Sequence, residues 1–279
     1  MGDSILVGVT DTQASRRAVD WAARRAREQS GRIELISIIG GVIGTVGEGT
    51  VVNEAIDLTR AMLEREAERV RAREVPVETR LGRGNPVEEL INESIVFDLL
   101  VIGSDYRGPD TGTNRGPHGV RIVAGAHCPV AVVPDIDLTG RSGVIVGVDG
   151  SPISESAIEF AAAEADRSGE VLTAVSTWTT VPLPLDMRSY PMNYLSAMQK
   201  LTEEALAISL AGIMQKYPDL TVQKVVERGY PAPTINRLAV DARLTVVGSR
   251  GRGAVARFLL GSTSQEVLTH LATTTVVVR

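Results

Sequence analysis

The chain has 279 residues, 43% of them apolar, which is enough for two domains that each bury a core of their own. Its 34 acidic and 29 basic residues give a net charge of −5, and no Lys/Arg block stands out, which argues against nucleic acid as the main partner. The apolar runs are too short to cross a bilayer, and the first residues lack the pattern of a signal peptide. We therefore expect a cytoplasmic protein with no membrane partner, and the single cysteine fits a reducing compartment.

The two halves of the chain repeat each other. Ile5–Thr10 (ILVGVT) is echoed by Val144–Asp149 (VIVGVD) at an offset of 139, and Val101–Ser104 (VIGS) by Val246–Ser249 (VVGS) at an offset of 145. A two-copy repeat of this length indicates a duplicated domain, because solenoid units have periods of about 20 to 50 residues. Turn-forming residues gather in Pro134–Gly143, between the two copies.

We place the domains at residues 1–138 and 139–279. In each copy, short β-branched runs alternate with helical patterns, which is typical of a parallel sheet covered by helices on both faces. The first helix of each copy carries alanines at helical spacing, which predicts a core-facing side. Five strands are predicted in the second copy, near 144–148, 171–175, 221–226, 244–247 and 275–278.

A glycine pattern follows the fourth strand of the second copy. Gly248-Ser-Arg-Gly251 is followed by nine residues and then by Gly261-Ser-Thr-Ser264, so the pattern reads G-x2-G-x9-G-S. Glycine is needed where backbone N–H groups approach a phosphate without a Cβ in the way. Ser262 with Gln265, or Thr263 with Glu266, is predicted to form a capping box that starts a helix, whose positive end favours an anion.

The first strand of the second copy ends at the same edge of the predicted sheet and delivers Asp149 there. Ligands of open α/β sheets bind outside the carboxyl ends of the strands. Asp149 is thus placed to accept a hydrogen bond from a ribose hydroxyl or from a metal-bound water, and capping of the next helix is an equally good interpretation. The second strand ends at Val175–Trp178, whose apolar and backbone groups are suited to hold a base edge.

Together, the glycine pattern, the opening strand VGVDGS, the Gly-x-Pro turn and the two-copy layout resemble tandem universal stress proteins of the actinobacterial kind. The resemblance covers essentially the whole chain. It implies two doubly wound, five-stranded parallel-sheet domains of order 3-2-1-4-5, like the adenine-nucleotide α-hydrolases, with ATP held in the second. It also implies pairing through the last strands, 130–133 and 275–278, as a homodimer or between the two domains of one chain. The ATP contacts implied by the resemblance are Gly147, Asp149, Thr177, Gly248, Ser249, Arg250, Gly251, Arg252, Gly253, Gly261, Ser262, Thr263 and Ser264.

The first copy departs from this pattern at four positions. Asp105 stands where the second copy has Arg250, and Tyr106 where it has Gly251. Pro117 and Thr10 replace the serine and the aspartate of the second copy. A side chain, an added negative charge and a lost hydroxyl all oppose phosphate binding. We interpret the first copy as a degenerate nucleotide site.

The sequence contains no paired nucleophile and base, and Asp149 is the one carboxylate suited to hold Mg²⁺ beside ATP. We therefore expect a nucleotide-dependent stress-response regulator and not an enzyme, with slow ATP hydrolysis left open. Two alternatives remain. One is an ATP-using enzyme of the adenine-nucleotide α-hydrolase group, although the segment Asp149–Pro152 does not match the serine-rich loop of such enzymes. The other is an interaction module without nucleotide.

Overall fold

The computed structural model describes residues 2–40, 49–106, 117–180, 190–251 and 260–279. The chain divides into two compact units, Met1–Ile136 and Asp137–Arg279, which we call unit 1 and unit 2. The sequence-based boundary, after residue 138, lies close to this division. None of the helices in the described ranges has the length and apolar character needed to cross a membrane.

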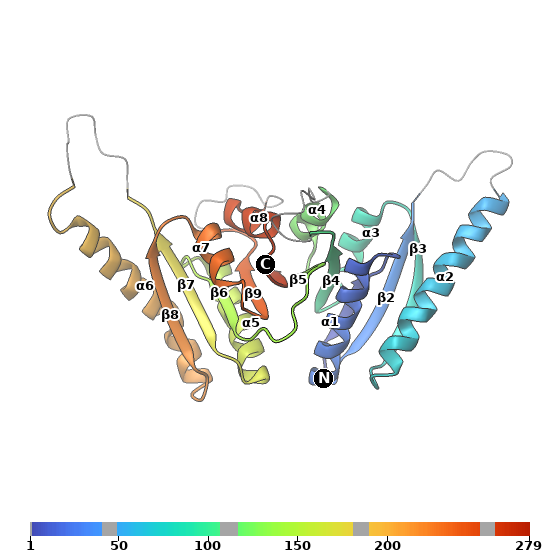
Figure 1. The fold of residues 1–279 in the computed structure, drawn as a ribbon, viewed down its shortest axis with the longest axis horizontal. Coiled ribbons are helices and arrows are strands. Elements are labelled where there is room, and N and C mark those ends of the chain that lie inside the picture. The colour runs from blue at the N-terminus through green and yellow to red at the C-terminus, as the bar shows by residue number, and fades with distance from the viewer. Residues whose placement is uncertain (1, 41–48, 107–116, 181–189, 252–259) are drawn as a thin grey trace. The chain divides into compact units, whose positions relative to one another are not determined.

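In unit 1, five parallel strands lie in the order β3-β2-β1-β4-β5, with helices in every connection (Figure 1). The reversal of strand order falls between β1 and β4. The elements are β1 (Ser4–Gly8), α1 (Gln13–Gln29), β2 (Arg32–Ile39), α2 (Gly49–Arg71), β3 (Val77–Arg83), α3 (Pro86–Glu93), β4 (Leu99–Ser104), α4 (Pro117–Gly125) and β5 (Val130–Pro134).

Unit 2 repeats this order as β8-β7-β6-β9-β10, again with parallel neighbours. The predicted α/β fold, with strand order 3-2-1-4-5 in each half, is confirmed. The elements are β6 (Val144–Gly147), α5 (Pro152–Ser168), β7 (Leu172–Trp178), α6 (Tyr194–Lys216), β8 (Val222–Arg228), α7 (Pro231–Leu238), β9 (Leu244–Gly248), α8 (Ser262–Thr269) and β10 (Thr275–Val278).

Strands β7 and β8 run further than the sequence predicted, to Trp178 and Arg228. Their last residues pair with each other, Thr177 with Glu227 and Trp178 with Arg228, beyond the point where β6 ends. The carboxyl end of β7 therefore extends beyond that of β6. The extra residues of β7 border the space at the carboxyl ends of the strands, where a ligand would lie.

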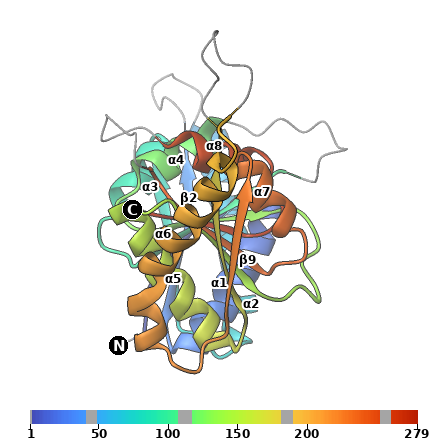
Figure 2. The same cartoon turned by 90° about the vertical axis from the view of Figure 1, so that its left-hand side faces the viewer.

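Helices α5 and α6 lie together on one face of the sheet of unit 2, and α7 and α8 contact each other on the opposite face (Figure 2). The inner side of α5 carries Ala157, Ala161 and Ala165, each fully buried. Because alanine has the smallest side chain that still favours a helix, this stripe brings the helix close to β6 and β9. The predicted core side of the helix is confirmed.

A glycine at the carboxyl end of the fourth strand, Gly103 in β4 and Gly248 in β9, makes this close approach possible in both units. A Cβ built on Gly103 would lie 2.6 Å from the carbonyl carbon and oxygen of Ala14, at the start of α1. In unit 2, a Cβ on Gly248 would lie 2.8 Å from Cγ2 of Ile153 and 3.5 Å from its carbonyl carbon. A residue with a Cβ at Gly103 would thus push the helix off the sheet.

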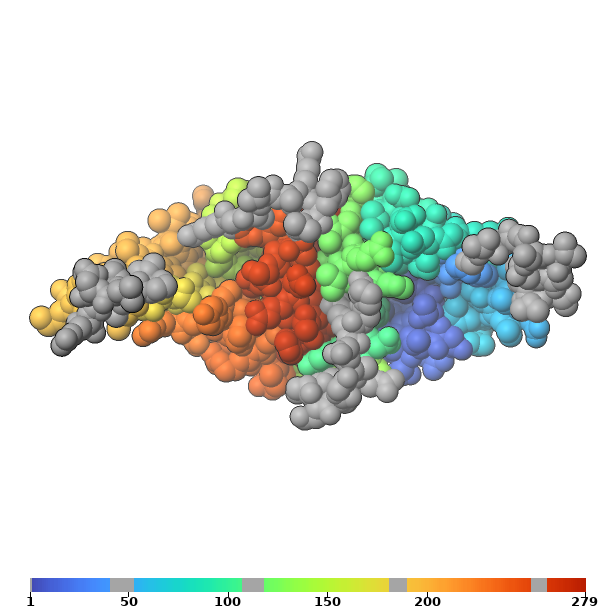
Figure 3. Space-filling view, turned by 90° about the horizontal axis from the view of Figure 1, so that it is seen from above, coloured from blue at the N-terminus to red at the C-terminus, as the bar shows by residue number. Residues whose placement is uncertain are grey.

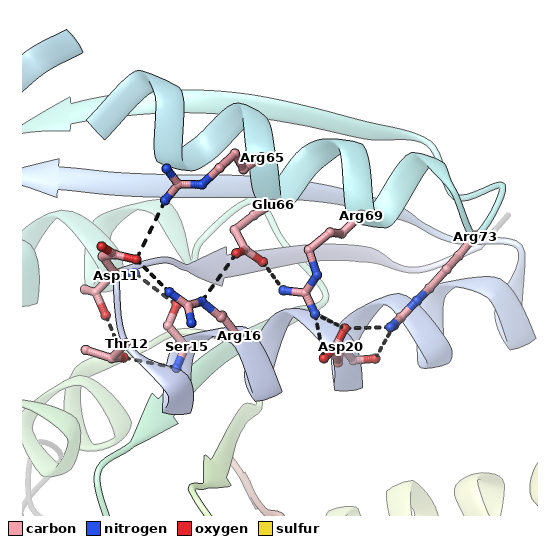
Figure 4. A network of polar contacts seen from close by, with 10 residues as sticks. Asp11, Thr12, Ser15, Arg16, Asp20, Arg65, Glu66, Arg69 and Arg73 are labelled. Atoms are coloured by element: carbon pink, nitrogen blue, oxygen red, sulfur yellow. Dashed lines mark hydrogen bonds and ion pairs between the residues drawn. The ribbon is translucent and has the colours of Figure 1, made fainter. Parts of the chain in front are cut away.

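A network of ion pairs connects helices α1 and α2 of unit 1 (Figure 4). Arg69 donates to both carboxylate oxygens of Asp20, at 2.8 and 2.9 Å, and Arg73 donates to Oδ1 of Asp20 at 2.6 Å. Arg69 also pairs with the buried Glu66, whose other carboxylate oxygen lies 3.9 Å from Nε of Arg16. Several charges share partners here, so the contribution to stability exceeds that of an isolated surface pair.

We predict that Gly103→Ala destabilises the protein by about 2 kcal/mol, because the new methyl group meets backbone atoms that cannot move without shifting α1. The matched control is Gly212→Ala near the C-terminal end of α6, where an added Cβ meets nothing within 4 Å. This control should stabilise the protein by about 0.5 to 1 kcal/mol, the helix preference of alanine over glycine. Urea unfolding measures both changes, and equal effects of the two substitutions would contradict the packing argument.

We also predict that Asp20→Asn lowers the stability of unit 1 by about 1 kcal/mol, since two arginines lose their shared carboxylate. The loss should shrink in 1 M NaCl, where the Debye length is about 3 Å. Glu159→Gln is the control, because Glu159 is the exposed residue at the corresponding place in α5. Thermal unfolding at low and high salt checks this, and a salt-independent loss would rule out the electrostatic cause.

Candidate nucleotide site

A pocket of about 690 Å³ opens at the carboxyl ends of the strands of unit 2. Figure 3 looks onto this end of the unit, where α7 and α8 (orange to red) lie next to each other. The pocket draws on the ends of β6, β7 and β9, on the start of α5 and on the turns before α7 and α8. It therefore lies where the strand order reverses, the usual place for a ligand in a doubly wound sheet.

Ten of the thirteen residues predicted from the sequence line this pocket. Ser249 does not, because it is 2% exposed and its N–H donates to the carbonyl of Val278 at 2.6 Å. Arg252 and Gly253 lie outside the described residues. The ten are Gly147, Asp149, Thr177, Gly248, Arg250, Gly251, Gly261, Ser262, Thr263 and Ser264.

The side chain of Asp149 lies between the start of α5 and the glycine loop. Its Oδ1 accepts a hydrogen bond from the N–H of Ser151 at 2.9 Å. Ser151, and not Asp149, is the N-cap of α5, since its hydroxyl accepts from the N–H of Ser154 at 3.2 Å. A methyl group on Gly251 would overlap Oδ2 of Asp149. The carboxylate thus lies against the second glycine of the loop, and the capping interpretation of Asp149 is wrong.

The start of α8 differs from the prediction. Gly261 is the N-cap, and no side chain in the described part of the chain caps the helix, so neither predicted capping box forms. The physical reason is that Ser262 and Thr263 already lie in the first turn, one and two residues after the cap position. Gly261 is instead held by its N–H, which donates to the carbonyl of Ser249 at 2.8 Å.

The missing cap has a consequence for ligand binding. The first N–H groups of a helix have no partner within the helix, and here no side chain takes that role among the described residues. The hydroxyl of Ser264 is also turned to the loop, where it donates to the carbonyl of Gly248. The N-terminus of α8 is therefore available to an anion, and the helix dipole favours a negative charge there. Its two hydrogen bonds to the glycine loop hold this end of the helix in place.

Other pocket residues were not identified as site members from the sequence. The Gly229-Tyr-Pro231 turn before α7 and Ile235 on that helix line the pocket, as does Ser154, while Trp178 belongs to the segment already predicted to hold a base edge. The repeat itself carried a signal for two of them, because Gly84-Asn-Pro86 echoes the turn and Ser15 echoes Ser154. Their convergence on one cavity depends on strand order, which no local pattern contains.

Unit 1 uses the same positions differently. Tyr106, in the place of Gly251, is buried, and its carbonyl accepts a hydrogen bond from the N–H of Asp135 at 3.0 Å. The N–H of Thr10, in the place of Asp149, donates to the hydroxyl of Ser15 at 2.9 Å. Asp105 is exposed. The second glycine of a phosphate loop is thus replaced in unit 1 by a packed aromatic side chain.

Across the described ranges of the chain, no three His, Cys, Asp or Glu side chains come together in a way that could hold a metal ion.

Comparison with known proteins gives a consistent result over both units. The model of the universal stress protein family matches residues 1–134 and 142–279. Universal stress protein Rv2623 of Mycobacterium tuberculosis is 32% identical over 287 residues, covering 98% of this chain and 95% of the relative. Universal stress protein Rv2005c of the same organism is 31% identical over 293 residues, covering 98% and 96%.

Solved structures agree at the level of the fold. A universal stress protein from Archaeoglobus fulgidus superposes with a TM-score of 0.74 at 19% identity, covering 100% of this chain and 99% of its own. Single-domain matches to half of the chain include a universal stress protein in complex with cAMP (TM-score 0.33) and an Arabidopsis thaliana family protein with AMP bound. By its family model and its full-length relatives, the chain belongs to the universal stress protein family, with one copy of the family domain in each half.

Proposed function

We propose that unit 2 binds ATP and that the protein acts as a nucleotide-dependent regulator in a stress response. The observation that carries this proposal is the pocket in which a glycine loop, Asp149 and the uncapped start of α8 meet. Its volume of about 690 Å³ lies within the range of cofactor sites, roughly 300 to 1,000 Å³.

The polar side of the pocket suits a phosphate chain. Gly251 and Gly261 leave the backbone accessible, and Arg250 adds a positive charge to the lining. Asp149 would repel a phosphate that came close, unless a cation lay between the two. Mg²⁺ brought in with ATP would supply that cation, because carboxylate and phosphate oxygens are its preferred ligands.

The opposite side of the pocket suits a nucleoside. Val175, Val247 and Ile235 are buried apolar residues of the lining. Trp178 is held in place by its indole N–H, which donates to Oε1 of Gln199 at 2.7 Å. An apolar wall next to strand ends with backbone donors and acceptors fits a purine base. An adenine nucleotide is also what the two family members crystallised with cAMP and AMP hold.

The lining of the pocket supports a regulatory role without dedicated catalysis. Among the described residues of the lining, Asp149 is the one carboxylate and no histidine or cysteine accompanies it, so we expect ATP hydrolysis to be slow at most. Binding to the folded state alone stabilises that state, by about 2.7 kcal/mol at a ligand concentration 100 times Kd. Occupancy would in this way favour one conformation of the loops around the pocket.

The remaining expectations stay predictions. These are a cytoplasmic location and pairing through the last strands, β5 and β10, either between copies or within one chain. An enzyme that uses ATP to activate a substrate, and an interaction module without nucleotide, are the competing functions. Multiple turnovers that depend on a second substrate would favour the enzyme.

We predict that the purified protein retains or binds one ATP per chain, in unit 2. Nucleotide extracted from the protein and quantified by chromatography, together with calorimetric titration of the nucleotide-free protein, measures this number. Two sites of similar affinity would contradict the degenerate character of unit 1. No binding of any adenine nucleotide would leave the interaction module as the better function.

We predict that Gly251→Ala lowers the affinity for ATP by at least about tenfold while the fold persists, since the new methyl group displaces only the flexible carboxylate of Asp149. The control is the same change in an Asp149→Ala background, where the obstructing carboxylate is gone. Gly251→Ala should cost little further affinity there. Additive losses in the double variant would mean that the glycine acts independently of Asp149.

A further inference from the structure

Ser154 has a buried hydroxyl that no other described residue bonds to. The residue lies in the first turn of α5, is 3% exposed and lines the pocket. Its Oγ has no hydrogen-bond partner in the described part of the chain. A buried hydroxyl left without a partner costs about 1 to 3 kcal/mol, so such a group calls for an explanation.

The duplicated domain supplies a direct comparison. Ser15 is the counterpart of Ser154 and makes the same N-cap bond, since its N–H donates to Oγ1 of Thr12 at 3.2 Å. The hydroxyl of Ser15, however, accepts a hydrogen bond from the N–H of Thr10 at 2.9 Å. The backbone setting is therefore the same in both units, while the hydroxyl is used in one and unused in the other.

The difference coincides with the change from Thr10 to Asp149 at the end of the first strand. In unit 2, the carboxylate of Asp149 takes the N–H of Ser151. No bond from the backbone of Asp149 reaches Oγ of Ser154, which has no partner. The serine hydroxyl is therefore left without a described partner in unit 2, which is the unit that contains the pocket.

The position of Ser154 indicates which part of a ligand it would meet. Its neighbour Ile153 lies against Gly248, the first glycine of the loop, with a side-chain approach of 2.8 Å to a Cβ built there. The start of α5 therefore lies beside the glycine loop, and Ser154 lines the pocket together with Gly248 and Gly251, at the positive end of α5. A hydroxyl donates readily to a phosphate oxygen, and hydrogen bonds to charged groups are the stronger ones.

We propose that Oγ of Ser154 donates a hydrogen bond to a phosphate oxygen of the bound nucleotide, so that the ligand satisfies a group that the folded protein leaves without a partner. This inference rests on the proposed function of unit 2. It adds α5 to the glycine loop and α8 as a third element that contacts the phosphates. It also explains why the two copies differ in the use of one serine that both retain.

The test compares Ser154→Ala with Ser15→Ala in the full-length protein. Calorimetric titration with ATP, ADP, AMP and adenosine measures binding, and thermal unfolding of the nucleotide-free protein measures stability. We expect Ser154→Ala to weaken ATP binding about tenfold, to leave adenosine binding unchanged and not to lower the melting temperature. Ser15→Ala should lower the melting temperature, because it removes the bond from Thr10, and should leave ATP binding unchanged.

Three results would overturn the inference while the proposed function stands. These are unchanged ATP affinity in Ser154→Ala, an equal loss for adenosine and ATP, and a fall in melting temperature matching that of Ser15→Ala. If the wild-type protein bound none of the four ligands, the proposed function would fail, and the inference with it. Adenosine, AMP, ADP and ATP differ by one phosphate group at each step. The first of these ligands that Ser154→Ala binds more weakly than the wild type identifies the phosphate group that Ser154 contacts.

Discussion

The close contact between the first helix and the end of the fourth strand is the constraint on which each unit depends. Because that strand carries a glycine at its carboxyl end, the start of the helix lies against it in both units. The same contact brings the positive end of α5 to the edge where β6, β7 and β9 finish. Gly248 therefore has two roles in unit 2. Its missing Cβ lets α5 pack against the sheet, and the same residue lines the pocket.

Much of this arrangement could be predicted from the sequence. The repeat indicated the number of domains, and β-branched runs indicated the strands. The resemblance to a known family, recognised partly from the spacing of glycines, implied ten of the residues that line the pocket. These patterns are local, because each can be interpreted from residues that are close together in the sequence. Strand order came from the resemblance to a known family and not from the residues alone.

What could not be predicted depends on contacts between distant segments. Whether Ser262 caps α8 is decided by where Gly261 is held, and it is held by the carbonyl of Ser249, twelve positions earlier in the sequence. The inward position of Ser249 depends on its bond to β10. The unused hydroxyl of Ser154 is visible only when both copies are compared in three dimensions, since the serine itself is the same in each.

The contact between Asp149 and Gly251 also bears on how two copies of one domain can diverge. While the aspartate is present, a residue larger than glycine at position 251 would displace its carboxylate. Unit 1 has the shorter Thr10 at the place of the aspartate, and there Tyr106 is buried at the place of the glycine. The two positions therefore differ together between the units, because the size of the residue at one limits the residue that the other can hold.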